Sequence, residues 1–156
     1  MEQTLLKEDV GIQDQILTAY GGLNVVKIDP DSAFRVNPIP MQPMRKELFQ
    51  HHLMLIYTGI SRTASDVAKS QIESIPQKEQ VMREIQDMVP EATKILAGTG
   101  DLNDFGRLLH ESWLLKKSIS NKITTSVVDN MYEKAIGAGA LGGKLLGAGG
   151  GGFMIF

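Results

Sequence analysis

The sequence predicts an α+β domain in which a small antiparallel sheet is covered by helices. Two apolar runs, residues 53–57 and 153–156, have the length and composition of buried strands. Amphipathic helical patterns fill most of the chain between them. The second run directly follows five glycines in six positions, residues 147–152. We therefore expect the two runs to pair in one sheet, with the glycines forming a loop beside it.

The composition is ordinary for a globular protein, with 42% apolar and 22% charged residues in a chain of 156 residues. A net charge of −2 gives no electrostatic case for nucleic acid or anionic membrane partners. The absence of cysteine excludes disulfides and thiolate metal sites. We find no signal peptide and no apolar run near the length of a membrane span, so a cytoplasmic location is expected.

Residues 2–20 have the apolar spacing of two helical pieces with a break near residues 9–11. Asp14 falls near the start of the second piece, where the helix dipole favours an acidic side chain. The functional alternative is a carboxylate that faces a cleft and orients or deprotonates an alcohol.

Residues 23–28 and 34–39 predict two strands joined by a turn at residues 29–32. A stiff proline-rich connection follows, and we place a domain boundary near residue 41. Residues 1–40 are expected to be a remnant of a preceding domain with much exposed apolar surface, and residues 41–156 a second domain.

Helices are expected around residues 45–51, 64–75, 78–97, 101–118 and 125–139. Pro90 should kink or split the third of these. Asp101 is the expected cap of the fourth, and Gly139 should end the fifth. The expected core includes Leu55, Leu108, Trp113, Tyr132 and Phe153.

Several polar residues have two open interpretations. Thr58, Ser61 and Arg62 follow the strand at residues 53–57 and would either cap the next helix and pair at the surface, or bind phosphate or sugar oxygens. His110 has no partner visible in the sequence and is interpreted as structural, with a catalytic role as the alternative. Lys116 and Lys117 fit surface lysines at a helix end, with contact to a sugar phosphate as the alternative, and no role is assigned to Lys144.

The glycines at 147 and 149–152 can adopt positive φ angles and allow close approach of a ligand or another backbone. Consecutive N–H groups in such a turn can form a concave anion site. Because the run ends in four large apolar residues, we expect packing to hold it rigid rather than to leave it as a linker.

The longer string Gly142-Gly-Lys-Leu-Leu-Gly-Ala-Gly-Gly-Gly-Gly-Phe153 resembles the third, C-terminal motif of the GHMP small-molecule kinases. This superfamily includes galactokinase, homoserine kinase, mevalonate kinase and phosphomevalonate kinase, and its loop lies beside the ATP phosphate loop and borders the acceptor. The resemblance implies that the ATP side of the site includes Gly147, Gly149, Gly150 and Gly151. It implies that Gly152 borders the acceptor.

Two further segments carry the resemblance. Gly11-Ile-Gln-Asp-Gln15 resembles the G-x-x-D-Q segment of sugar kinases, which implies that Asp14 is the catalytic base and that Gly11 and Gln13 contact the acceptor. Glu2 matches a galactokinase-like glutamate that holds Mg²⁺. Tyr57-Thr-Gly-Ile-Ser-Arg62 resembles a segment of the heptose and fucose kinase branch, which makes Arg62 a candidate for contacting an acceptor phosphate.

This resemblance implies an ATP- and Mg²⁺-dependent kinase that phosphorylates the anomeric hydroxyl of D-glycero-D-manno-heptose 7-phosphate, for nucleotide-heptose and surface polysaccharide synthesis. Its partners would be ATP and the sugar phosphate, with no nucleic acid and no membrane. The alternatives are a fucokinase- or galactokinase-like sugar 1-kinase, a non-catalytic ligand-binding module of the same fold, or a purely structural α+β domain.

The sequence departs from the family in one respect, because the first motif and the serine-bearing ATP loop are absent. Both lie upstream of Met1 in the family order, and both chain ends look cut. We therefore expect a fragment whose partner is the missing N-terminal segment, and which is inactive by itself.

Overall fold

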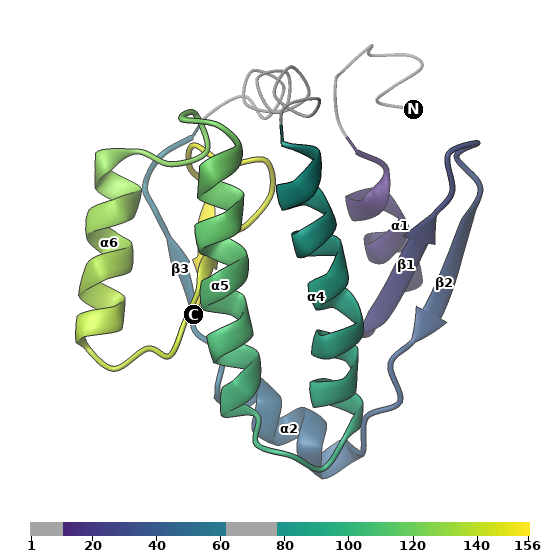
Figure 1. Ribbon diagram of the computed structural model, residues 1–156. Helices are drawn as coiled ribbons and strands as arrows, with labels where there is room; N and C mark the ends of the chain where they lie inside the picture. Colours follow the sequence, from purple (N-terminus) through teal and green to yellow (C-terminus); the bar gives the residue numbers. More distant parts are fainter. Residues whose placement is uncertain (1–10, 62–77) are drawn as a thin grey trace.

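The computed structural model describes residues 11–61 and 78–156 (Figure 1). The expected α+β class is confirmed. In chain order the elements are α1 (Gln13–Tyr20), β1 (Asn24–Ile28), β2 (Phe34–Pro38), α2 (Pro43–His51), β3 (Leu55–Tyr57), α4 (Glu79–Ala97), α5 (Asn103–Ile119), α6 (Ser126–Gly137), β4 (Lys144–Leu145) and β5 (Phe153–Ile155).

The central sheet has three antiparallel strands in the order β3-β5-β4. Leu55 pairs with Ile155 and Tyr57 pairs with Phe153, so the prediction that the two apolar runs share one sheet is confirmed. The short strand β4 was not predicted, because two residues between glycines are too few to show an alternating pattern.

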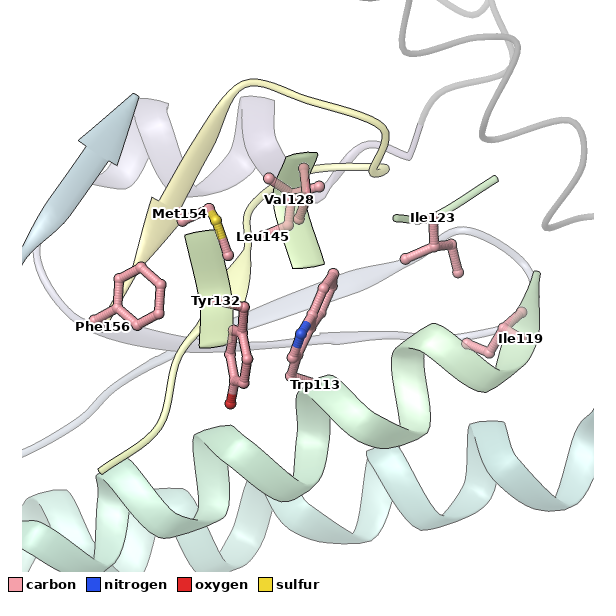
Figure 2. Packing of buried hydrophobic residues seen from close by; sticks show 8 residues of the cluster. All are labelled: Trp113, Ile119, Ile123, Val128, Tyr132, Leu145, Met154 and Phe156. Carbon is pink, nitrogen blue, oxygen red and sulfur yellow. The ribbon is translucent and has the colours of Figure 1, made fainter. Parts of the chain in front are cut away.

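Helices α5 and α6 cover one face of this sheet and form the core with it (Figures 1 and 2). Met154 and Leu145 are fully buried beneath these helices. The ring of Tyr132 lies 6.0 Å from that of Trp113 and 5.8 Å from that of Phe156, measured between centroids. The aromatic side chains therefore join helices and sheet into one apolar cluster.

Three of the five expected core residues are buried, namely Leu108, Trp113 and Tyr132. The prediction is wrong for Leu55, which is 59% exposed, and for Phe153, which is 47% exposed. Successive side chains of a strand point to opposite faces, and the helices of the described residues cover one face of this sheet. In β3 and β5 the side chains on one face are therefore buried or half-buried and those on the other face are more exposed, whereas the apolar runs predicted burial on both faces.

Strands β1 and β2 form a separate antiparallel hairpin, as expected. The turn is closed by a hydrogen bond from the Asp29 N–H to the Ala33 carbonyl at 2.8 Å, and by an exposed ion pair between Arg35 and Asp29. Ile28 and Phe34 on this hairpin are 45% and 43% exposed. The domain boundary near residue 41 stays a prediction.

Helix α4 is a single helix of 19 residues that packs along α5. Pro90 lies inside it and does not split it, whereas the alternative of a kink at Pro90 stays a prediction. Proline removes one backbone hydrogen bond, but burial of the long apolar face against α5 favours the helix on both sides of it. Helix α2 packs against the C-terminal end of α4, where the Arg45 guanidinium donates to the Ile95 carbonyl at 2.7 Å. It also contacts the first turn of α5 through the rings of Phe49 and Phe105.

The N-cap of α5 is Leu102 and not the expected Asp101, which lies one residue before it. The Asp101 carboxylate accepts from the Asn103 N–H at 2.9 Å, and the Thr125 hydroxyl accepts from the Val128 N–H at 3.3 Å. Gly139 follows α6 with a φ of +107°. The helix expected at residues 64–75 lies outside the described residues, and within them no helix is long and apolar enough to cross a membrane.

Candidate functional site

Residues 146–152, here called the glycine loop, connect β4 to β5. The loop is anchored from two sides by backbone hydrogen bonds. The Gly150 N–H donates to the Ile123 carbonyl at 2.8 Å, and the Gly152 N–H donates to the Ile60 carbonyl at 2.9 Å. The loop is thus held between the α5–α6 connection and the segment after β3, which agrees with the expectation that it is rigid.

Two positions in the loop have no room for a side chain. A Cβ at Gly149 would lie 2.8 Å from the Ile123 carbonyl oxygen, and φ at Gly149 is +129°. A Cβ at Gly151 would lie 2.6 Å from the Ile60 carbonyl oxygen. The backbone of the loop therefore approaches its two supports as closely as glycine permits.

The N–H groups of Gly149 and Gly151 alternate with the two anchored ones, and no described residue accepts a hydrogen bond from them. Unpaired backbone N–H groups in a glycine turn suit the oxygens of an anion. The loop therefore fits the phosphate chemistry that its sequence implies, with the remaining donors left to an anionic ligand.

Thr58 anchors the same loop from β3. It is buried, and both its N–H and its hydroxyl donate to the Gly152 carbonyl, at 2.8 and 2.9 Å. The hydroxyl also accepts from the Ile60 N–H at 3.2 Å. These bonds favour a structural role for Thr58 over contact with a ligand. Ser61 is exposed, and Arg62 lies outside the described residues.

Lys116 on α5 reaches the start of the glycine loop. Its ammonium donates to the carbonyls of Gly147 at 2.6 Å and Leu145 at 3.3 Å. Burial, and then repulsion by Lys144, lower the pKa of Lys116 to about 8, while the charge of Asp14 acts in the opposite direction. Lys116 is therefore a half-buried cation that interacts with the loop, with a second lysine and with Asp14.

Lys144 on β4 is the second lysine of the site. Its ammonium donates to the Ser112 hydroxyl at 3.1 Å, and burial lowers its pKa. Sequence reasoning assigned no role to Lys144 and favoured the surface for Lys116. The sequence spacing could have indicated that Lys116 is partly buried. Lys116 lies one helical turn after Ser112 and Trp113, so it continues the side of α5 that faces the sheet.

Asp14 lies in the first turn of α1, with its side chain exposed, as the sequence predicts. Gly11 and Gln13 lie beside it at the helix start and are also exposed. The carboxylate of Asp14 is near enough to act on the ammonium of Lys116. The two groups do not form an ion pair, so this attraction acts at longer range, between the start of α1 and the lysine that contacts the glycine loop.

His110 and Lys117 are occupied elsewhere in the domain. His110 Nδ1 forms a hydrogen bond of 2.6 Å with the Tyr132 hydroxyl, and burial raises the pKa of Tyr132. Lys117 pairs with Asp129 at 3.0 Å. These contacts agree with the structural interpretation of His110 and argue against a sugar-phosphate contact by Lys117.

No group of three or more His, Asp or Glu side chains that could hold a metal ion occurs among the described residues. Glu2, the predicted Mg²⁺ ligand, lies outside them. A cavity of about 520 Å³ lies elsewhere in the domain, where Phe49, Phe105 and Leu141 contribute to its walls. Neither Asp14 nor the glycine loop lines it.

Comparison with known proteins agrees with this architecture. Residues 81–156 match the family described as GHMP kinases C terminal. The chain is 29% identical to the D-glycero-alpha-D-manno-heptose 7-phosphate kinase of Campylobacter jejuni, over 96% of the chain and 46% of that protein. It is 24% identical to the bifunctional fucokinase/GDP-fucose pyrophosphorylase of Arabidopsis thaliana, over 93% of the chain and 14% of that protein.

Two solved structures share the fold. The mevalonate kinase of L. major superposes with a TM-score of 0.71 at 23% identity, covering 91% of this chain and 42% of that one. A D-glycero-D-manno-heptose 1-phosphate kinase from Bacteriodes thetaiotaomicron superposes with a TM-score of 0.58 at 24% identity, covering 99% of this chain and 40% of that one. The chain spans less than half the length of each of these four proteins. Together with the glycine loop at the β4–β5 turn, these matches show that residues 81–156 are a GHMP kinase C-terminal domain.

Proposed function

We propose that this chain is part of an ATP-dependent sugar kinase in which Asp14 and the glycine loop border one phosphoryl-transfer site. The observation that carries the proposal is the position of Lys116. Its ammonium donates to the Gly147 carbonyl at 2.6 Å and is also within electrostatic reach of Asp14. A base and a phosphate loop must act on the same reacting group, and this arrangement supports that requirement.

The proposed reaction is a phosphoryl transfer with Asp14 as the base. An acceptor hydroxyl loses its proton to Asp14 as its oxygen bonds to the γ-phosphorus, and the bond from that phosphorus to the bridging oxygen breaks to release ADP. Gly11 and Gln13, at the start of α1, are positioned to orient the acceptor beside the carboxylate, and Gly152 borders it from the loop. The N–H groups of Gly149 and Gly151 would donate to the transferred phosphate, and Gly147 and Gly150 would line the ATP side of the same loop.

Mg²⁺ would neutralise charge on the transferred phosphate, with Glu2 as the proposed ligand from this chain. A carboxylate is the ligand type that Mg²⁺ prefers, and one carboxylate with several waters is a common arrangement for this ion. Removal of free Mg²⁺ with a chelator should therefore abolish turnover.

The acceptor that we propose is D-glycero-D-manno-heptose 7-phosphate, phosphorylated on its anomeric hydroxyl. Support comes from the similarity to a heptose 7-phosphate kinase along 96% of the chain. Arg62 is the proposed contact for the 7-phosphate, because a guanidinium can form two parallel hydrogen bonds with it.

The 156 residues contain no serine-bearing ATP loop of the family, so we propose that turnover requires that loop together with this chain. In this proposal residues 1–40 belong to the domain that carries the loop, and residues 41–156 form the C-terminal domain. The chain by itself should bind ligands at most weakly and release no ADP.

The test is a coupled ADP-release assay on a protein that joins the ATP loop to this chain, with several sugars as acceptors. We expect heptose 7-phosphate to be the acceptor with the highest kcat/KM, and Arg62→Lys to raise its KM more than the KM for ATP. Equal or better turnover of unphosphorylated fucose would instead favour a fucokinase, which the similarity to a plant fucokinase makes the second candidate. Ligand binding without turnover of any sugar would indicate a non-catalytic module.

A further inference from the structure

Two lysine side chains from different elements meet beside the glycine loop. Lys116 extends from α5 and Lys144 from β4, and the charge of Lys144 disfavours the charged form of Lys116. Both side chains are half-buried. No carboxylate among the described residues forms an ion pair with either lysine. Two neighbouring half-buried ammonium groups without a paired anion are unfavourable, and an anionic ligand would remove that cost.

The site retains unused hydrogen-bond donors. An ammonium has three donors, and Lys116 uses two of them on the carbonyls of Leu145 and Gly147. Lys144 uses one donor on Ser112. The N–H groups of Gly149 and Gly151 are also without a described acceptor. A ligand group with several anionic oxygens matches this set of donors, whereas a single carbonyl or hydroxyl would leave most of them unpaired.

We propose that Lys116 and Lys144 together bind a phosphate group of the ligand, on the loop side of Asp14. The proposal deepens the function proposed above and rests on it, because it names a second pair of residues in the same site. The phosphate has two sources of the same chemistry, the γ-phosphate of ATP and the phosphate of the sugar. Lys116 also positions the glycine loop, because it holds the Gly147 carbonyl.

Phosphate binding and protonation of Lys116 should be linked. The groups that act on the Lys116 ammonium are Lys144 on β4, which lowers its pKa, and Asp14 on α1, which raises it. A bound dianion adds attraction for the charged form and should raise the pKa of Lys116 above its value of about 8 in the free protein. By the same linkage, phosphate should bind more weakly as the pH rises above 8 and the free lysine loses its proton.

The first experiment measures binding of inorganic phosphate by titration calorimetry in the complete protein that contains the chain. Lys116→Met and Lys144→Met should each weaken binding by about ten-fold or more, since each removes a charged donor. Lys94→Met, at the exposed end of α4, is the matched control and should leave the affinity unchanged. Wild-type affinity should fall between about pH 7.5 and about pH 9.5, and this fall should be smaller in Lys116→Met, where only Lys144, whose pKa is also lowered by burial, still titrates.

A second measurement guards against misfolded variants. The pKa of Lys116 is followed by NMR of its Cε group in the wild-type protein, with and without phosphate, which requires no substitution. A rise of the pKa on adding phosphate supports the proposal. An unchanged pKa at saturating phosphate, or an equal affinity of all three variants and the wild type, would overturn it.

Two comparisons identify which phosphate binds here: ATP against ADP, and heptose 7-phosphate against fucose. If the γ-phosphate binds here, Lys144→Met weakens ATP binding but leaves ADP binding unchanged. If the sugar phosphate binds here, the same variant raises the KM for heptose 7-phosphate and leaves that for fucose unchanged. Phosphate binding that depends on the lysines without sugar turnover would refute the proposed kinase and keep this inference. Sugar turnover that neither lysine substitution affects would refute this inference and keep the proposed kinase.

Discussion

At the scale of single residues, the candidate site is set by an ammonium group that is expensive to bury. Lys116 stays charged at neutral pH although burial and Lys144 both oppose its charge. A side chain that only filled space on this stripe of α5 would be apolar. Its two hydrogen bonds to the glycine loop and the attraction of Asp14 offset part of the cost. The position of this charge makes Lys116 a functional candidate.

The cost of the Lys116 charge should appear as a pH dependence of stability. The pKa is about 8 in the folded protein and 10.5 as its ordinary value, so between these two values the unfolded chain binds more protons. The free energy of unfolding should therefore rise with pH in that window, by an amount on the order of 2–3 kcal/mol, and be unaffected by this group below pH 8.

The measurement is denaturant unfolding of the wild type and Lys116→Met in phosphate-free buffers across this window. The variant lacks the titrating group, so the difference between the two proteins isolates the contribution of Lys116 and its coupling to Lys144. Parallel pH profiles for the two proteins would show that the Lys116 ammonium is not buried as described.

At the scale of elements, the β4–β5 connection is anchored so closely that it does not behave as a flexible loop. The Gly149→Ala change should destabilise the domain by about 2–4 kcal/mol, because it adds a methyl group against the Ile123 carbonyl at a positive φ. Gly147→Ala is the matched control in the same loop, since nothing lies within 4 Å of its added Cβ. Its left-handed φ of +67° should cost only about 1–2 kcal/mol.

Thermal and denaturant unfolding of the two variants measure this difference. Equal losses of stability would indicate that the close contact between Gly149 and Ile123 is relieved at little cost. A larger loss for Gly147→Ala would contradict the described anchoring of the loop.

The elements also show what the sequence could and could not predict. The pairing of residues 53–57 with 153–156 followed from two short apolar runs, and the structure confirms it. The predicted burial of Leu55 and Phe153 was wrong, because a three-residue strand has too few positions to reveal which of its faces the described helices cover. Lys116 and Lys144 were not assigned to the site, because their meeting depends on the packing of α5 against β4, which no local pattern encodes.

At the scale of the whole molecule, an apolar sheet face is left uncovered by the described residues. Leu55 and Tyr57 on β3 lie on the same face as Phe153 on β5, and they are 59%, 54% and 47% exposed. The rings of Tyr57 and Phe153 are in contact, with centroids 5.0 Å apart. A contiguous apolar patch of this kind is typical of an association surface.

The isolated chain should therefore self-associate with rising concentration. The double change Leu55→Thr with Phe153→Thr introduces polar β-branched residues, which suit strands, and should reduce association, as measured by light scattering after size-exclusion chromatography. Ile28→Thr on β1 is the matched control, since Ile28 is 45% exposed in the other sheet. A monomeric wild-type chain at every concentration, or an equal effect of the control, would contradict this prediction.

In the complete protein, we expect Asp14 to act as the base in a site that it shares with the glycine loop. Asp14→Asn keeps the size of the side chain and removes its charge and proton acceptor. The direct measurement is the steady-state rate of ADP release with heptose 7-phosphate, in a protein that joins the ATP loop to this chain. Asp87→Asn, at an exposed position on α4, is the control. We predict a loss in kcat of roughly 10²–10⁴-fold for Asp14→Asn, with ATP affinity little changed and full activity in the control. Unchanged turnover in Asp14→Asn would contradict the account.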